Sequence, residues 1–366
     1  MSAPPPTSSS APRPQARSSP QPRGWRWFFE RYGALLALLV LIVGTAIVEA
    51  WKVPVEDRAF LKPQNFINIL RQNSMWGIVA VGMTYVIILG GIDLSVGSMV
   101  ALLGGAAIFA MNAVAESGQS ATLAVSTSVG VCLLGGVLLG LVNGLTISWG
   151  RIAPFVATLG TMAIFRSLIL GPAKGSEIRA GVSSYADIGS GTVELPFIHI
   201  NTTAEDPVGS PLMLPYPVIA FFASVIIGQL VLSFTSFGLK VYSIGDNHRA
   251  ARYAGIHIGR VTTAVYAICG LSAGLAALLT SSRLNSIASS STGLFYELDA
   301  IAAVVIGGTR LQGGAGRVWT TAIGVLIIGV TTNMLTMLQI DTYYQNMVKG
   351  LIVIGAVLLQ VRKPTE

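Results

Sequence analysis

The stretch Gly90-Gly91-Ile92-Asp93-Leu94-Ser95-Val96-Gly97-Ser98 separates two long apolar runs, residues 75–89 before it and 96–110 after it. It places glycines, hydroxyls and one carboxylate inside what hydropathy would otherwise make a continuous membrane segment. In hydrocarbon, a backbone that leaves a helix must find its hydrogen bonds in protein or in a water-lined cavity. The glycine pair therefore predicts the end of one helix, and we expect Asp93 to cap the first amides of another that begins near Leu94.

Asp93 at this break has two interpretations. An ionisable group at an interrupted membrane helix marks a functional site by default, because burying its charge is costly. The alternative is a plain N-cap at the cytoplasmic edge of the membrane. The residues of the stretch favour both equally.

The composition is that of a membrane protein. Of the 366 residues, 52% are hydrophobic and 11% charged, whereas soluble domains carry about 25% charged residues. The mean hydropathy is +0.67. The formal net charge of +7 follows the predicted topology rather than forming a stripe, so nucleic acid is not expected as a partner. Cys132 and Cys269 lie in apolar runs, and we expect both to be buried small side chains.

The hydropathy pattern predicts an all-α polytopic membrane protein with about ten transmembrane helices, some of them broken or re-entrant. The eighth span is too short to cross as a regular helix, which needs about 20 residues, and the glycines at its end support a break. The predicted spans are 32–50, 65–89, 94–112, 121–147, 152–171, 216–236, 261–281, 297–308, 318–338 and 344–361.

Basic residues indicate the topology, because cytoplasmic segments of membrane proteins are enriched in Lys and Arg. Most basic side chains fall in segments that are interior if both termini are cytoplasmic. We therefore expect a disordered cytoplasmic tail over 1–31, a transmembrane domain over 32–361 and a cytoplasmic C-terminus over 362–366. The longest exterior segment, 172–215, is either a docking surface for an external protein or a solvated loop.

The predicted cytoplasmic loop 237–260 is the second informative segment. We expect a short helix in it, with a cap at Asp246 or Asn247 and a left-handed end at Gly255. Alanines would form a smooth face of this helix and arginines the other side, which favours contact with another protein over binding to lipid. The predicted contact residues are Gly245, Asp246, Asn247, Arg249, Ala250, Ala251, Arg252 and Gly255, with Ala254 completing the alanine face.

The third segment reads Y-E-L-D-A-I-A-A-V-V-I-G-G-T over 296–309 and is followed by a glycine-rich turn over 313–317. Glu297 and Asp299 are expected at the outer mouth, where they bind a polyhydroxyl solute, receive a cation of a docking protein, or remain solvated loop acids. Polar residues in other regions either line a path for a neutral polar solute or join helices. They are Asn143, Thr158, Thr161, Ser272, Asn285 and Asn333.

Two absences concern the source of energy. The sequence has no G-x-x-x-x-G-K-[ST] motif, so we expect the chain to bind neither ATP nor another cofactor itself. Its three histidines have no metal-ligand spacing, and no Ser/His/Asp set indicates an enzyme. A transporter with this sequence must take its energy from a separate ATPase or from an ion gradient.

The three segments resemble the membrane permease subunit of ribose- and xylose-type ATP-binding-cassette importers of simple sugars, over about residues 65–361. The resemblance implies a homodimer in the bacterial inner membrane with the path at its two-fold interface. It also implies a cytoplasmic ATPase that binds ATP and magnesium and pushes on the helix at 245–256. An external sugar-binding protein would deliver the monosaccharide, which the motifs leave open among pentoses, hexoses and cyclitols.

In this scheme Asp93 and Ser95 shape the inner part of the path, while Glu297 and Asp299 mark its outer entrance. Glycines allow the backbone to come close to a solute or to a neighbouring helix. The predicted path residues are Gly90, Gly91, Asp93, Ser95, Asn285, Glu297, Asp299, Gly307 and Gly308.

Two other functions are alternatives to a sugar-importing permease. An ion-coupled secondary transporter of a small polar solute would need charged relays inside the spans, where the basic residues are only Arg71, Arg166 and Lys349, and Asp93 stands at the break between two spans. A membrane-embedded enzyme would need an acid pair or a histidine at one membrane face. Only the 172–215 segment offers it an aqueous loop, and the spacing of residues there matches no recognisable site.

Overall fold

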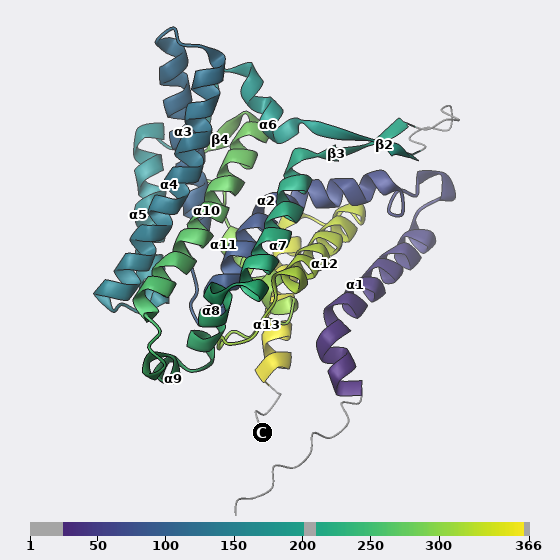
Figure 1. Cartoon of the computed structure of the whole chain (residues 1–366). Coiled ribbons are helices and arrows are strands. Elements are labelled where there is room, and N and C mark those ends of the chain that lie inside the picture. Colours follow the sequence, from purple (N-terminus) through teal and green to yellow (C-terminus); the bar gives the residue numbers. More distant parts are fainter. Residues whose placement is uncertain (1–24, 201–209, 362–366) are drawn as a thin grey trace, which may run out of the picture. The chain divides into compact units, whose positions relative to one another are not determined.

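The computed structural model describes residues 25–200 and 210–361, most of which are helical (Figure 1). The chain divides into two compact units, Met1–Gly33 and Ala34–Glu366, and the second carries every element after the first turns of α1. The helices are α1 (Trp25–Lys52), η1 (Val55–Asp57), α2 (Pro63–Ile88), α3 (Val96–Glu116), α4 (Ala121–Gly150), α5 (Pro154–Ala173), η2 (Ser183–Tyr185), α6 (Ala186–Ser190), α7 (Tyr216–Phe234), α8 (Ser236–Asp246), α9 (His248–Tyr253), α10 (Ile258–Leu284), α11 (Tyr296–Ile306), α12 (Val318–Met337) and α13 (Thr342–Val361).

Each of the ten predicted spans coincides with one helix of the structure. Among the described residues, seven helices are long and apolar enough to cross a membrane: α1, α3, α4, α5, α7, α10 and α12. The eighth predicted span is the 11-residue helix α11, so its predicted shortness is confirmed. Helix α1 begins at Trp25, so the predicted tail over 1–31 extends several residues too far along the chain. Residues 1–24 and 362–366 lie outside the described part of the chain.

The predominance of helices agrees with the predicted all-α polytopic fold, and four short strands lie between the helices. They form two antiparallel pairs, β1 (Glu177–Arg179) with β4 (Ser286–Ala288) and β2 (Thr192–Ile200) with β3 (Ser210–Pro215). Three of the strands belong to the 172–215 segment, where apolar and polar residues alternate around β-branched side chains, a pattern typical of strands. Strand pairing satisfies backbone groups that no helix serves there.

Helix α2 lies at the centre of the packing, and every residue from 74 to 88 is buried. Its outer surfaces meet α7, α10, α11 and α12, so α2 is covered on all sides over this stretch. Apolar and small side chains make up most of it, which fits a helix that contacts protein rather than lipid.

Glycines allow α4 and α10 to pack with their backbones in contact. A Cβ atom on Gly140 would lie 2.3 Å from the Tyr266 carbonyl oxygen, and one on Gly270 would lie 2.2 Å from the Gly136 carbonyl oxygen. Both helices carry glycine at intervals of four residues, which is the spacing that brings membrane helices together most closely. Cys132 and Cys269 on these helices are free and buried, as predicted.

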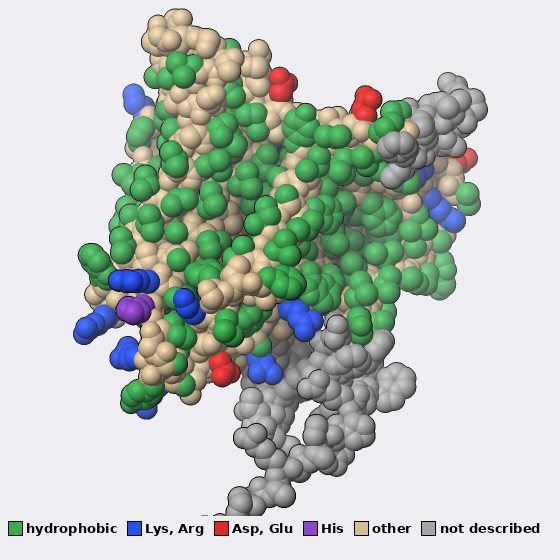
Figure 2. Space-filling model, viewed as in Figure 1, with side chains coloured by type: hydrophobic (Ala, Val, Ile, Leu, Met, Phe, Trp, Pro, Cys, Tyr) green, Lys and Arg blue, Asp and Glu red, His purple; other side chains and the backbone are tan. Residues whose placement is uncertain are grey.

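The two predicted extramembrane segments lie at opposite ends of the helices. Figure 1 shows α6, β2 and β3 at the upper end and α9 at the lower end. In Figure 2 hydrophobic side chains cover most of the face shown, and several Lys and Arg side chains with a histidine gather at the lower end. The loop 237–260 and the segment 172–215 are therefore on different sides of the apolar region.

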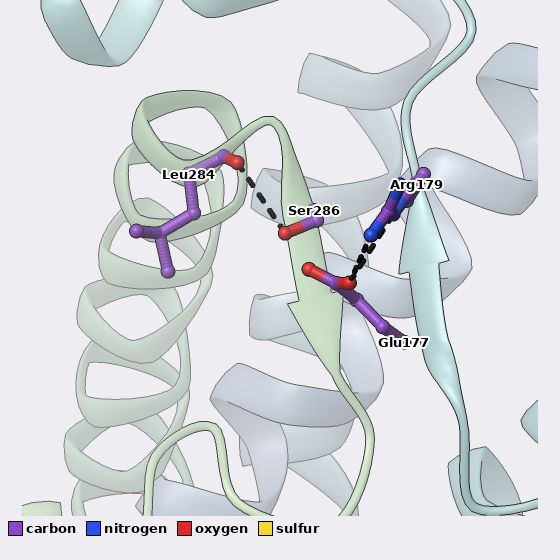
Figure 3. Close-up of polar contacts among 4 residues, drawn as sticks. All are labelled: Glu177, Arg179, Leu284 and Ser286. Atoms are coloured by element: carbon purple, nitrogen blue, oxygen red, sulfur yellow. Dashed lines mark hydrogen bonds and ion pairs between the residues drawn. The ribbon is translucent and has the colours of Figure 1, made fainter.

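The β1–β4 pair ties the segment after α5 to the segment after α10 (Figure 3). Arg179 Nη2 lies 3.1 Å from Glu177 Oε2, and Ser286 Oγ donates to the Leu284 carbonyl oxygen at 3.3 Å. The Ser286 hydroxyl and then the Arg179 guanidinium hold the pKa of Glu177 below its usual value. This exposed polar cluster sits directly on the strand pair.

Candidate functional site

The predicted break between two membrane helices is present. Helix α2 ends at Ile88 and α3 begins at Val96, and Gly90 has a φ of +89°, a conformation that favours glycine. The start of α3 is two residues later than expected. Asp93 Oδ1 accepts from the Ser95 amide (2.9 Å) and the Ser95 hydroxyl (2.6 Å). It therefore closes the turn before the helix instead of capping the amides of its first turn, and Ser95 occupies the N-cap position.

Asp93, Ser95 and Asn143 form a fully buried polar network, each with 0% exposure. The Asn143 amide donates to Ser95 Oγ at 2.8 Å and lies 3.4 Å from both carboxylate oxygens of Asp93. Donors thus surround the carboxylate, which reduces the cost of burying it. Asn143 Oδ1 has no hydrogen-bond partner among the described residues. In this conformation the predicted inner path residues are enclosed by the chain.

Two more helices hold the carbonyl group of Ile92. Thr158 Oγ1 on α5 donates to it at 3.3 Å, and the Tyr266 hydroxyl on α10 donates at 3.4 Å. Side chains of α5 and α10 therefore bond to the non-helical backbone between α2 and α3, as an interruption inside a membrane requires, while Asn143 of α4 bonds to its side chains. The sequence pattern indicated Thr158 as a polar residue of a span but did not indicate Tyr266.

A second interruption precedes α11. Helix α10 ends at Leu284, and Asn285 adopts the left-handed conformation with a φ of 52°. The chain then contains the short strand β4 and no helix until α11 begins at Tyr296. Asn285 Oδ1 is buried without a hydrogen-bond partner among the described residues. Arg166 Nη1 on α5 donates to the carbonyl oxygens of Ser289 (3.1 Å) and Thr292 (2.9 Å). Arg166 thus anchors this segment, a role that the sequence did not indicate.

The two interruptions meet at the starts of α3 and α11. A Cβ atom on Gly97 would lie 2.2 Å from the Gly293 carbonyl oxygen, and one on Gly293 would lie 2.2 Å from the Gly97 carbonyl oxygen. Glu297 Oε2 lies 2.5 Å from the same Cβ position on Gly97. The carboxylate therefore stands against the N-terminal turn of α3, where the helix dipole favours negative charge. No sequence pattern indicated this pairing.

The acids at the start of α11 are not solvated loop residues. Asp299 Oδ2 pairs with Lys349 Nζ of α13 at 3.2 Å, with side-chain exposures of 14% and 23%. At 1.5 Å per residue, about 15 Å of helix separates Glu297 from Gly307, so α11 reaches only about halfway through a hydrocarbon core of about 30 Å. A role of Glu297 and Asp299 at the outer entrance of a path stays a prediction.

At the opposite end of α11, three separate segments come into contact. The Gly314 amide donates to the Ile88 carbonyl oxygen at 2.9 Å, and the Tyr242 hydroxyl donates to the Gly316 carbonyl oxygen at 2.7 Å. Gly245 packs so closely that a Cβ atom there would lie 1.9 Å from the Ile88 carbonyl oxygen and 2.5 Å from the Gly314 amide nitrogen. We call this cluster of Ile88, Gly245 and Gly314 the glycine junction. It joins α8 directly to the last residue of α2.

The predicted glycines of the path lie on either side of the junction. Gly91 lies close to Tyr266, because a Cβ atom on it would stand 2.7 Å from the tyrosine hydroxyl oxygen. Gly307 packs against the Thr320 backbone at the start of α12, and Gly308 has a φ of +87° that ends α11. These glycines therefore serve close packing and chain reversal in this conformation.

The predicted helix of the loop 237–260 is α9. Asn247 is its cap, since Asn247 Oδ1 accepts from the amides of Arg249 (3.1 Å) and Ala250 (3.0 Å), while Asp246 ends α8. Gly255, with a φ of +78°, provides the predicted left-handed end.

The expected alanine face of α9 is divided. Ala251 is only 3% exposed and packs into the core, whereas Ala250 and Ala254 are exposed beside Arg249 and Arg252. The face is divided because α9 has only six residues, and its one buried side chain, Ala251, is needed to attach the helix to the rest of the protein. Tyr253, 91% exposed, adds a large aromatic side chain to the free surface that the sequence analysis did not single out.

Comparison with known proteins gives a consistent result. The family described as "Branched-chain amino acid transport system / permease component" matches residues 65–357. A ribose import permease protein of Haemophilus influenzae is 38% identical, covering 90% of this chain and 93% of that protein. One from Bacillus subtilis is 40% identical, covering 91% and 94%. A xylose transport system permease protein of Escherichia coli is 33% identical, covering 88% and 90%. No solved structure matches the chain.

Proposed function

The chain belongs to the branched-chain amino acid transport system / permease component family, and from this membership we propose that it is the membrane-spanning subunit of an ATP-binding-cassette importer for a monosaccharide. The ribose and xylose permease proteins support the choice of solute, because they resemble this chain over about nine-tenths of its length. A transport subunit is not itself an enzyme. Nothing in these similarities favours an ion-coupled transporter.

The glycine junction is the observation that carries the mechanism. Helix α9, which carries the exposed residues, follows α8 directly in the chain, and Gly245 near the end of α8 contacts Ile88, the last residue of α2. Force applied to α9 by an ATPase would therefore reach the break at Gly90–Ser95 through α8 alone. Closely packed backbones transmit such a displacement, because they have no side-chain freedom to absorb it.

The polar network at the break would then act as the inner closure of the path. Asp93, Ser95 and Asn143 are enclosed in this conformation, and movement of α2 relative to α4 would expose them to a solute. Hydroxyl, amide and carboxylate groups suit the hydrogen-bonding surface of a sugar, and a path must bind its solute weakly enough to release it.

The topology is part of the same proposal. Ten crossings with both termini in the cytoplasm place α9 inside and the 172–215 segment outside. Support comes from the separation of α9 from α6, β2 and β3 (Figure 1) and from the basic side chains at the α9 end (Figure 2). The protein would be a multi-pass protein of the bacterial inner membrane.

The partners follow from this arrangement. We expect a homodimer with the path at its two-fold axis, and a cytoplasmic ATPase that holds ATP and magnesium and contacts α9. An external sugar-binding protein would dock on the described part of 172–215, where β1 is bonded to β4 of the segment that leads into α11. Docking outside and ATP binding inside would then act on the two interrupted segments.

Reconstitution tests the function. The chain would be placed in proteoliposomes together with its ATPase and binding protein, and uptake of radiolabelled ribose and xylose would be measured with and without internal ATP. We expect uptake that requires ATP and persists when ionophores remove all ion gradients. Uptake that stops with the ionophores and continues without ATP would establish the ion-coupled alternative instead.

A further inference from the structure

Two arginines from different helices, Arg71 and Arg283, lie on either side of Met75. Arg71 is in the third turn of α2 and Arg283 is the next-to-last residue of α10. Both side chains are partly buried, and Met75, which Arg283 contacts, lies about one helical turn after Arg71 on the same face of α2. The Arg283 guanidinium lies 4.0 Å from the sulfur of Met75, a weak acceptor that carries no charge.

Within the described part of the chain, neither arginine has a carboxylate partner. The ion pairs among the described residues are Arg179–Glu177 and Lys349–Asp299. Arg71 Nε is enclosed and has no hydrogen-bond partner among them. Partly buried cations are costly unless an opposite charge or several acceptors stand beside them. The arrangement therefore has strong donors for which the described residues supply no charged acceptor.

The groups around the pair do not supply that acceptor. Tyr296 at the start of α11 is close to both Arg283 and Asp299, but a phenol is uncharged near pH 7. Asp299 is already paired with Lys349 at 3.2 Å. Counting Arg71, Arg283, Arg166 and Lys349 against Glu297 and Asp299, the region holds two more positive charges than negative ones.

The depth of the pair indicates the size of the occupant. Arg71 comes eight residues after Pro63, the first residue of α2, which corresponds to about 12 Å along the helix. Arg283 comes three residues before β4, so the pair lies toward the β1–β4 end. An acidic side chain on the flat surface of a docking protein extends only a few ångströms, so a small solute reaches this depth more readily.

We propose that Arg71 and Arg283 form an oxyanion-binding site that takes the carboxylate or phosphate group of a sugar-derived solute. Guanidinium groups offer paired N–H donors that match the two oxygens of a carboxylate or phosphate. The sugar part of this assignment rests on the proposed function, whereas oxyanion binding depends only on the arginine pair. The carried solutes would then include acidic sugars in addition to neutral monosaccharides.

Binding to the purified full-length chain tests the site. The chain is placed in nanodiscs of a zwitterionic lipid in chloride-free buffer, and gluconate, ribose 5-phosphate and neutral ribose are titrated calorimetrically. We expect both oxyanions to bind at least tenfold more tightly than ribose, and sulfate to compete with them. Arg71→Gln and Arg283→Gln should each weaken oxyanion binding by roughly tenfold or more, and Arg283→Lys by less, since it keeps the charge.

Arg260→Gln is the matched control, because this arginine is exposed and lies in the first turn of α10, at the opposite end of that helix from Arg283; it should bind oxyanions like the wild type. Equal binding of ribose and gluconate, or failure of sulfate to compete in the wild type, would overturn the proposal even if the glutamine variants do not fold. Loss of binding on adding an anionic lipid would assign the pair to a lipid headgroup and overturn the solute assignment. Oxyanion binding without ATP-driven uptake would instead count against the proposed function alone.

Discussion

Replacing Gly245 by alanine tests whether the glycine junction links α9 to the break after α2. The new Cβ atom would stand 1.9 Å from the Ile88 carbonyl oxygen and 2.5 Å from the Gly314 amide nitrogen. Ordinary contact begins at 3.4 Å, so the end of α8 must retreat by about 1.5 Å, which is 3.4 minus 1.9. Both neighbours are backbone atoms that bond to each other, and neither can turn away.

The energetic cost follows from two terms. Insertion of an extra methyl group into a packed contact costs about 1–3 kcal/mol, and loss of the Gly314–Ile88 hydrogen bond adds about 0.5–1.5 kcal/mol. The sum is about 1.5–4.5 kcal/mol for the docked position of α8. Because about 1.4 kcal/mol corresponds to a factor of ten, we expect the docked population to fall more than tenfold.

The assay measures ATP hydrolysis and sugar uptake on the same proteoliposomes. The exposed residues of α9 are unchanged by the substitution, so association with the ATPase should stay within about twofold of the wild type, while uptake per ATP hydrolysed should fall about tenfold. Gly130→Ala is the control, since a Cβ atom on Gly130 meets nothing within 4 Å. A Gly245→Ala protein with a normal ratio of uptake to hydrolysis would refute the coupling role of the junction.

Four further predictions concern single contacts. Gly140→Ala should lower the free energy of unfolding by about 1–3 kcal/mol, because its Cβ atom meets a carbonyl oxygen of α10; thermal unfolding in detergent beside Gly130→Ala measures it, and equal stability of the two would contradict the close packing. Asp93→Asn removes the charge that three donors share and should cost about 1–3 kcal/mol with slower uptake; unchanged uptake would make Asp93 structural only. Arg249→Glu combined with Arg252→Glu should weaken ATPase association, measured by co-purification, while membrane insertion stays normal, and undiminished co-purification would remove α9 from the interface. Neighbouring side chains hold the pKa of Glu177 below its usual value in the folded chain, so Glu177 stabilises the β1–β4 pair at pH values above its unfolded pKa. This stabilisation is lost as the pH falls through the folded pKa, and amide exchange in the pair, corrected for intrinsic rates, should then become faster. Protection from exchange that does not change with pH would exclude the effect.

Local sequence predicted the features that a few neighbouring residues determine. The glycine pair at 90–91 ended a helix, Asn247 capped α9 and Gly255 closed it, because each depends on backbone conformation over one turn. The start of α3 was missed by two residues because Asp93 bonds to Ser95 rather than to the helix.

The features that the sequence did not predict depend on residues far apart in the chain. Gly97 meets Gly293, and Arg166 anchors the backbone at Ser289, over 100 residues away. The burial of Ala251 likewise depends on tertiary packing, and composition alone cannot distinguish it from Ala250. Each requires the helices to be placed before the contact is visible.

The backbone contact between α4 and α10 limits how the protein can move. Two helices that touch through Gly140 and Gly270 cannot slide past each other without colliding with a carbonyl group, so they behave as one stationary frame. Any opening must then come from the elements around that frame, with α2 and α8 as the moving part. Spectroscopic distances between labels on α4 and α10 should therefore stay constant throughout the transport cycle.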